Sequence, residues 1–358
     1  MRISVLLPVV CGGLVIAGSV AAQSAKEPPR SDARAALVLA RQGSFEAGGR
    51  IIGDAEKSQS CDHGHVEYQI PVKARALPLF LWHSSSAAVW QRRWDGGEGF
   101  QSIFLRRGFA TYVWDGPRVG RANYGCEDYT YQAMPGRDEA GFVAWRFGPR
   151  PMEWFPGLQF PAGDPEAWNQ ARRARYDEFD TVQNAEIEAA AAAKALDRIG
   201  PSVLVTNSAG GLRAMLTAIK SDNVAAIVAY ENPGFVLLDE GQPKIEPGPY
   251  GPVYVSAPEF DRLTRIPIQL VWGDNIGKAG NWHRSYAASQ AFVRTINARG
   301  GKAEILHLPD KGLRGNTHIP FADLNNVAVA DLLSAFLHQH GLDRRPKRGA
   351  RQSGTFRP

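Results

Sequence analysis

A serine stands where a run of apolar residues gives way to small ones, in Val203-Leu204-Val205-Thr206-Asn207-Ser208-Ala209-Gly210-Gly211-Leu212. The run predicts a buried strand over 202–206, and the residues after Ser208 predict a helix over 209–221. A serine on such a sharp corner exposes its hydroxyl beside helix N–H groups that favour negative charge. This pattern indicates a nucleophilic serine. Because Thr206 replaces the first Gly of the G-x-S-x-G pattern, an ordinary turn or a phosphate loop is the alternative interpretation.

A nucleophilic serine needs a base, and the base needs an acid that orients it. On a sheet of this kind the base follows the last strand and precedes the last helix. Of the eight histidines, His318 has that position. Two acids compete for the third role, because Glu231 follows the predicted strand 224–230 and Asp274 follows 266–272. Spacing alone leaves both acids open.

The charge that develops on an attacked carbonyl oxygen needs two N–H donors. One is expected at Ala209, directly after the serine. The other is expected in the loop after a predicted strand at 77–82, at Ser84 or Ser85. Glycines are common in such a loop, so the serine hydroxyls here either add a donor or crowd the acyl group.

The elements that must position these residues alternate along the chain. Strands are predicted at 77–82, 109–114, 202–206, 224–230, 266–272 and 303–308, and helices at 98–107, 181–199, 209–221, 283–299 and 323–340. This order predicts an α/β protein with a mostly parallel central sheet flanked by helices. Two earlier segments, 44–50 and 65–72, predict a hairpin.

The segment from about 125 to 180 is rich in Trp, Pro and Gly and has no steady period. A structureless loop of that length inside a domain is improbable, so we expect an insertion that caps the site. Its aromatic residues could line a pocket for an apolar or aromatic ester, but packing of the cap on the core is the favoured interpretation. These residues are Trp145, Trp154, Phe155 and Trp168.

The N-terminus predicts secretion. A short basic start, an apolar run over 3–18 and small residues at 20–22 are typical of a signal peptide that ends near Ala22. We expect a linker at 23–42 and the main domain at 43–342. In an oxidising compartment, secreted or periplasmic, the pair Cys61 and Cys126 predicts a disulfide.

The net charge of +5 belongs to the C-terminal residues 343–358, which hold six Lys or Arg and one Asp, and the rest of the chain is neutral. The basic character therefore describes a tail, predicted to be disordered, and gives no reason to expect nucleic-acid binding. Contact of the tail with an anionic envelope surface is a weaker expectation. No CxxC or HExxH pattern is present, so we expect no metal and no cofactor.

Further segments extend the pattern around the serine: Gly43-Ser44-Phe45 with Gly48-Gly49-Arg50, Trp94-Asp95-Gly96-Gly97-Glu98-Gly99-Phe100, Arg106-Arg107-Gly108-Phe109, Asp115-Gly116-Pro117, Gly120-Arg121, Glu231-Asn232-Pro233-Gly234, and Gly315-Asn316-Thr317-His318 with Asn325-Asn326. Together they resemble the secreted bacterial esterases of the α/β-hydrolase superfamily that use a Ser–Glu–His triad. The resemblance runs from Gly43 to Asp343. It implies an α/β-hydrolase fold, with Ser208 as nucleophile, Glu231 as acid and His318 as base, and so favours Glu231 over Asp274.

The chain departs from that family at two places. The family tends to have His-Gly-Gly where this chain has His83-Ser84-Ser85, and it has His and Gln beside the nucleophile where this chain has Asn207 and Ala209. The resemblance implies a carboxylesterase that cleaves a small-molecule ester through an acyl-enzyme. Hydrolysis of a lactone, thioester or amide by the same triad is the first alternative, and a hydrolase-fold protein that binds without turnover is the second. The sequence does not indicate an oligomeric state.

Overall fold

The computed structural model describes residues 36–83, 86–128, 132–240 and 248–346. All of them belong to the unit formed by residues 35–358. The predicted signal peptide at 1–22, Ser84 and Ser85, and the tail beyond residue 346 lie outside the described residues. Within the described part, no helix has the length and apolar character needed to span a membrane.

Eight strands of the described chain form one sheet in the order β1-β2-β4-β3-β5-β6-β9-β10. Their bounds are β1 (Leu39–Gly53), β2 (Ser58–Pro71), β3 (Leu79–Trp82), β4 (Thr111–Asp115), β5 (Ser202–Asn207), β6 (Val224–Tyr230), β9 (Pro267–Trp272) and β10 (Lys302–His307). The pairs β1–β2 and β2–β4 are antiparallel, and all pairs from β4 to β10 are parallel. The predicted fold class, a mostly parallel sheet with helices around it, is confirmed.

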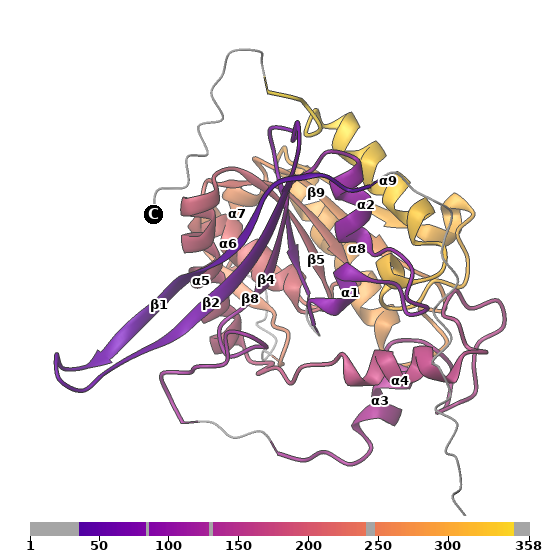
Figure 1. Ribbon diagram of the computed structural model, residues 1–358. Coiled ribbons are helices and arrows are strands. Elements are labelled where there is room, and N and C mark those ends of the chain that lie inside the picture. Colours follow the sequence, from indigo (N-terminus) through magenta and orange to yellow (C-terminus); the bar gives the residue numbers. More distant parts are fainter. Residues whose placement is uncertain (1–35, 84–85, 129–131, 241–247, 347–358) are drawn as a thin grey trace, which may run out of the picture. The chain divides into compact units, whose positions relative to one another are not determined.

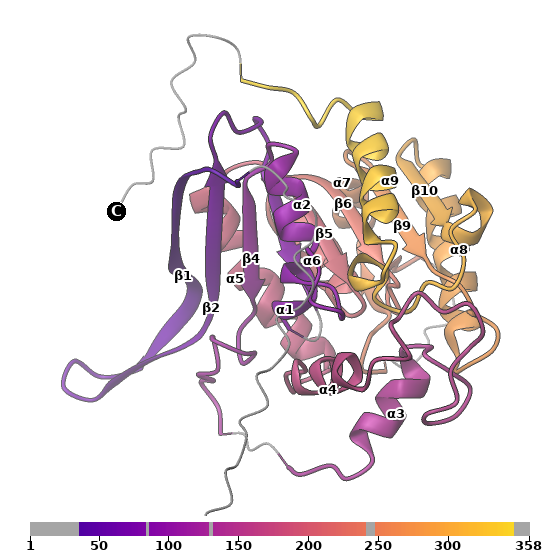
Figure 2. The same cartoon turned by 45° about the vertical axis from the view of Figure 1, so that its right-hand side comes forward.

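The central strands are continuous apolar runs because both of their faces are covered. In β5, Val203 and Val205 belong to one buried cluster and Leu204 belongs to the other. Helices α1 (Ala88–Gln91), α2 (Phe100–Arg106) and α9 (Asn326–Gln339) contribute to the first cluster. Helices α5 (Val182–Ile199), α6 (Gly210–Lys220), α7 (Ala257–Leu263) and α8 (Trp282–Ala298) contribute to the second. Figures 1 and 2 show α1 and α2 on one side of the strands, and α5 and α6 on the other.

The insertion between β4 and α5 contains two short helices, α3 (Arg137–Ala144) and α4 (Pro165–Arg173), which lie below the sheet in Figure 2. Its aromatic side chains pack on one another: the rings of Trp154 and Phe160 stack at 5.2 Å, and Phe142 meets Trp154 edge-on at 4.7 Å. Trp154 and Trp168 pack against the first core cluster. Most of the aromatic content of the insertion therefore serves packing.

The predicted Cys61–Cys126 disulfide is present and ties β2 to the start of the insertion. Both ends of the domain differ from the sequence expectation. Strand β1 begins at Leu39, inside the expected linker 23–42, because its pairing with β2 continues back to Pro71. The chain is also held past residue 342, since the N–H of Ala76 donates to the carbonyl of Arg344 at 2.9 Å.

Helix α1 was not predicted from the sequence, and neither were three elements in the second half of the chain. Strands β7 (Val236–Leu238) and β8 (Val253–Val255) form a separate parallel pair, and α7 follows them. The final helix starts at Asn326 rather than 323, because Pro320–Ala322 forms a 3₁₀ turn and Asp323 binds the preceding loop.

Candidate active site

Ser208 lies at the corner between β5 and α6, with a backbone φ of +50° that side chains rarely adopt. Its N–H donates to the carbonyl of Tyr230, at the end of β6, at 2.8 Å. The corner is crowded: a Cβ on Gly210 would lie 3.2 Å from the carbonyl oxygen of Trp82, and one on Gly211 would lie 2.5 Å from the Asn232 side chain. A side chain at Gly211 would therefore collide with Asn232, and one at Gly210 would be tightly packed.

His318 and Glu231 meet at the same edge of the sheet. Glu231 follows β6, and His318 lies in the loop between β10 and α9. The Nδ1 atom of His318 lies 3.6 Å from Oε2 of Glu231, slightly beyond a direct hydrogen bond, and both side chains are buried. Burial lowers the pKa of His318, and the carboxylate of Glu231 opposes that shift. The neutral imidazole is therefore favoured.

Glu231 is fully buried, and its backbone has a φ of +58°. Its Oε1 accepts hydrogen bonds from Nη2 of Arg146 at 2.6 Å and from the N–H of Gly273 at 2.5 Å. Burial by itself would raise the pKa of this carboxyl, but the charge of Arg146, with His318, outweighs it and leaves the pKa below its usual value. Glu231 is therefore held as a carboxylate.

Arg146 follows α3 in the insertion, and its side chain is fully buried. Besides the pair with Glu231, its Nε donates to the backbone carbonyl of Asp274 at 2.8 Å. A buried charge needs a partner of opposite charge, and these two form such a pair. Sequence analysis missed Arg146; the one available signal is a lone arginine within the aromatic run Trp145-Arg146-Phe147.

Asp274, the alternative acid, has a different place. Its Oδ2 accepts from the N–H of Gly315 at 2.9 Å and its Oδ1 from the N–H of Asn275 at 2.7 Å. The carboxylate thus fastens the start of the loop that carries His318. The pKa of Asp274 is lowered, because these amide hydrogen bonds outweigh the effect of burial.

Three other contacts fix His318. Its N–H donates to the carbonyl of Trp145 at 2.9 Å, and its own carbonyl accepts from Nδ2 of Asn207 at 3.1 Å. The indole of Trp282 lies against the imidazole, with 4.4 Å between ring centres. Asn207, one of the departures from the resembling family, therefore joins the nucleophile corner to the histidine loop.

Asp323 braces the same loop from the other side. Its carboxylate accepts from the N–H of Thr317 at 2.7 Å and from the Thr317 hydroxyl at 2.9 Å. Burial raises its pKa to about 7, although the Thr317 donors favour the ionised form. The residue before His318 is thus held by a buried acid that sequence analysis assigned to a helix.

Ala209, the expected first oxyanion donor, is the N-cap residue of α6, where helix N–H groups have no partner inside the helix. Ser84 and Ser85 lie outside the described residues. The residue before them, His83, is buried, with Nε2 2.9 Å from Oδ1 of Asp115. The pKa of His83 is lowered by burial against the opposing effect of Asp115, so a neutral ring anchors this loop to β4.

A cavity of about 390 Å³ opens beside Ser208. Both Ser208 and Ala209 line it, together with Trp145 from the insertion. The rest of its wall is mainly polar and charged, comprising Gln132, Met134, Arg137, Arg175, Tyr176, Asp177, Glu178, Phe179, Asp180 and Tyr250. The four aromatic residues noted in the insertion differ in their places. Trp145 belongs to the first core cluster and also lines this cavity. Trp154 and Trp168 pack against that cluster, and Phe155 is buried and does not line the cavity.

Comparison with solved structures identifies the fold. The structure of a bacterial esterase, solved at atomic resolution, matches with a TM-score of 0.72 and 26% identity over 86% of this chain and 98% of that one. The chain has the α/β-hydrolase fold. Naproxen esterase (carboxylesterase NP) from Bacillus subtilis matches at a TM-score of 0.42 and 13% identity, over 83% of this chain and 92% of that one. An esterase from Pyrococcus furiosus matches at a TM-score of 0.44 and 12% identity, over 84% and 91%. No protein-family model and no curated protein sequence matches.

The α/β-hydrolase fold allows the positions of Ser208, Glu231 and His318 to be compared with the usual order of catalytic residues. In this fold the nucleophile, the acid and the base occur in that order along the chain. Ser208 follows β5, Glu231 follows β6 and His318 follows β10, and these strands share one parallel array with β9. The arrangement can therefore carry nucleophilic acyl transfer chemistry.

Proposed function

We propose that this chain is a serine hydrolase that cleaves a carboxylic ester through an acyl-enzyme on Ser208. The observation that carries the proposal is the approach of His318 to a buried, ionised Glu231 at the sheet edge where Ser208 occupies a strained corner beside a cavity. The match to an esterase over nearly the whole length of that protein supports the same reaction class.

The proposed reaction has two steps. His318 takes the proton of the Ser208 hydroxyl, the serine oxygen attacks the ester carbonyl carbon, and His318 returns the proton to the departing alcohol. A water molecule, activated by the same imidazole, then cleaves the acyl-enzyme and frees the carboxylic acid. Because Nδ1 of His318 faces Glu231, Nε2 is the ring nitrogen assigned to these transfers. The N–H of Ala209, with one from residues 84–85, is assigned to the developing oxyanion.

The expected result of labelling with a fluorophosphonate probe is one adduct on Ser208, read by intact mass and peptide mapping. Ser208→Ala and His318→Ala should take up no label, because the first removes the nucleophile and the second its base. Ser60→Ala, which removes an exposed serine of β2, is the matched control and should label fully. Folded wild-type protein that takes no label would contradict the proposal and favour a binding protein without turnover. A panel of ester, lactone, thioester and amide substrates then separates the alternatives.

The pH dependence of kcat/KM should place the acidic limb below pH 6.5. His318 acts as a base only when neutral, and burial lowers its pKa below the usual value of 6.5. Activity should therefore persist as the pH falls through 6.5 and decline only below it. The measurement is a profile from pH 4.5 to 9 on a neutral ester, with unfolding monitored at each pH. A limb above pH 6.5 would contradict the assigned electrostatics.

We also propose that the mature protein is secreted or periplasmic. The predicted signal peptide at 1–22 carries this assignment, and the Cys61–Cys126 disulfide supports an oxidising compartment.

A further inference from the structure

One wall of the cavity beside Ser208 is built from carboxylates that are grouped around a buried guanidinium. Glu178 and Asp180 line the cavity, and Arg213 of α6 lies behind them. The Arg213 guanidinium is 3.4 Å from Glu178, 3.5 Å from Asp180 and 3.3 Å from Glu188 of α5. Three carboxylates therefore surround one cation.

Each of the three carboxylates has one oxygen without a hydrogen-bond partner among the described residues. In Asp180 and Glu188 that oxygen forms the ion pair with Arg213. Glu178 instead pairs with Arg213 through its other oxygen, Oε2. The Glu178 side chain is 7% exposed, and its Oε1 has no hydrogen-bond partner among the described residues. Burial raises its pKa well above the usual value, against the effect of Arg213, and burial also raises the pKa of Glu188 to about 7. A cation bound beside this wall would favour the ionised form of these carboxyls and would give the unpartnered oxygen of Glu178 an opposite charge.

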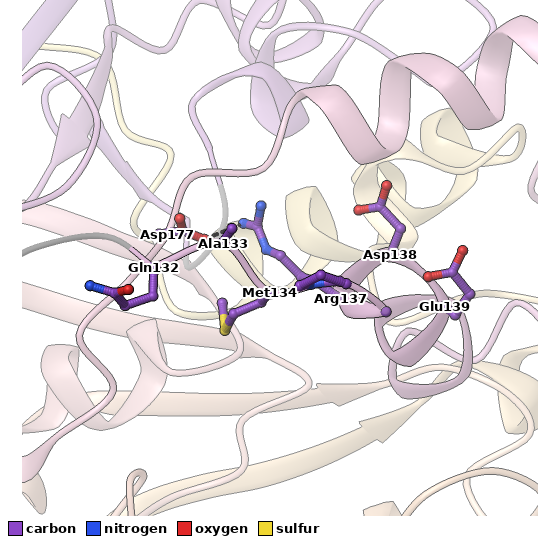
Figure 3. A pocket seen from close by; sticks show the side chains of 9 residues that line it. Gln132, Ala133, Met134, Arg137, Asp138, Glu139 and Asp177 are labelled. Atoms are coloured by element: carbon purple, nitrogen blue, oxygen red, sulfur yellow. Dashed lines mark ion pairs between the residues drawn. The ribbon is translucent and has the colours of Figure 1, made fainter.

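The positive groups around the cavity are already engaged. Arg137 forms an ion pair with Asp177 at 2.8 Å, and the guanidinium of Arg175 lies 4.7 Å from the ring centre of Trp145. An adjoining hollow of about 340 Å³ shares Arg137 and Asp177 with the cavity and adds two acids. Figure 3 shows these acids, Asp138 and Glu139, on one side of Arg137, and Gln132 and Met134 on the other. Five carboxylates and two guanidiniums line the two hollows, and Arg213 and Arg172 pair with three of these carboxylates from outside the lining.

Aromatic rings complete the wall. Tyr176, Phe179 and Tyr250 line the cavity beside the carboxylates, and the hydroxyl of Tyr250 donates to Asp180 at 3.1 Å. Aromatic faces attract organic cations through their quadrupoles, and a substituted ammonium is weakly hydrated enough to leave water for such a site. The contact of Arg175 with Trp145 is an example within this same wall.

We propose that the cavity selects esters that carry a substituted ammonium group, held between the Glu178–Asp180 wall and the neighbouring aromatic rings. The inference rests on the proposed function, because it assigns the substrate class of the same Ser208 site. It concerns charge complementarity alone, and either the acyl or the alcohol part of the ester can present the cation.

The test compares isosteric esters that differ in charge. On the alcohol side these are butyrylcholine and 3,3-dimethylbutyl butyrate. On the acyl side they are the phenyl esters of 4-(trimethylammonio)butyric and 5,5-dimethylhexanoic acids, with monophenyl glutarate as the anionic member. We expect wild-type kcat/KM to favour the cation at least tenfold in one series. Glu178→Gln, which removes the charge but keeps the shape, should lower that ratio at least fivefold, and Asp180→Asn should lower it as well.

Glu153→Gln is the matched control, because Glu153 is an exposed acid of the insertion paired with Arg150, outside the cavity wall. It should keep the wild-type ratio. A readout without turnover is the rate of fluorophosphonate labelling, which phenyltrimethylammonium should slow in wild type and slow less in Glu178→Gln. Hydrolysis of the neutral esters with no preference for the cation would overturn this inference and leave the proposed function intact. A preference for the anionic ester would assign recognition to Arg175 instead and overturn it as well, whereas failure of labelling would remove the proposed function itself.

Discussion

Replacing Glu231 with Gln is expected to lower kcat on a simple ester by roughly 10³- to 10⁴-fold, with little change in KM. The amide keeps the shape of the side chain but removes the charge that orients His318 and stabilises its protonated form. The loss therefore falls on the transition state. The measurement is steady-state kinetics on Glu231→Gln, with fluorophosphonate labelling as a second readout of serine reactivity.

Asp274→Asn is the matched variant. It also exchanges a carboxylate for an amide at the end of a neighbouring strand, but the Asp274 side chain accepts from the N–H groups of Asn275 and Gly315. We expect a loss of kcat of about tenfold or less, because the amide oxygen can still accept one of these bonds. A larger loss in Asp274→Asn than in Glu231→Gln would transfer the role of acid to Asp274.

Arg146→Met is expected to lower the free energy of unfolding by about 3–5 kcal/mol at pH 7, because it leaves Glu231 as a buried charge without its cation. Methionine keeps most of the buried volume, so the loss of charge dominates. Urea denaturation followed by tryptophan fluorescence measures it. Arg150→Met is the control: Arg150 is 78% exposed, its pair with Glu153 is at the surface, and the change should be below about 0.5 kcal/mol.

The loss of stability caused by Arg146→Met should become smaller as the pH falls. In the wild type the pKa of Glu231 lies below its usual value, so this group contributes stability above that usual value and loses the contribution as the pH falls through the lowered one. Without Arg146 the burial of Glu231 raises its pKa, so ionisation at neutral pH opposes folding. The difference between variant and wild type should therefore begin to shrink once the pH falls below the raised pKa of Glu231 in the variant, and should continue to shrink toward the lowered pKa of the wild type. A difference that is constant from pH 7 to 4.5 would assign the effect to packing.

Local patterns sufficed to predict most of the sheet. The apolar run of β6 was predicted at 224–230 and lies there, because a strand covered on both faces leaves a continuous signal. The run of five alanines at 189–193 favours a helix by propensity, and α5 lies over that run. Local patterns could not show that Glu188 in that helix turns inward to Arg213, because such a contact depends on a partner in another helix.

The candidate site could be predicted from the sequence only in part. Chain order was enough to propose Ser208 and His318 as candidates. Glu231 and Asp274 follow neighbouring strands, however, and side-chain direction decides which of the two faces the histidine. That direction is set by the positive φ of Glu231 and by Arg146, which lies 85 residues earlier in the chain. The periodicity of apolar residues contains no information about an ion pair between residues so far apart in the chain.

The insertion is part of the frame of the proposed site, since the carbonyl of Trp145 holds the backbone of His318 and the side chain of Arg146 pairs with Glu231. Exchange of this segment for that of another hydrolase would therefore change more than substrate specificity, because it would also remove contacts to His318 and Glu231. A chimera that replaces residues 125–180 as a block also replaces the counter-ion of the acid. A graft that keeps Trp145 and Arg146 and alters the residues on either side of them would change the binding wall but keep the contacts with His318 and Glu231.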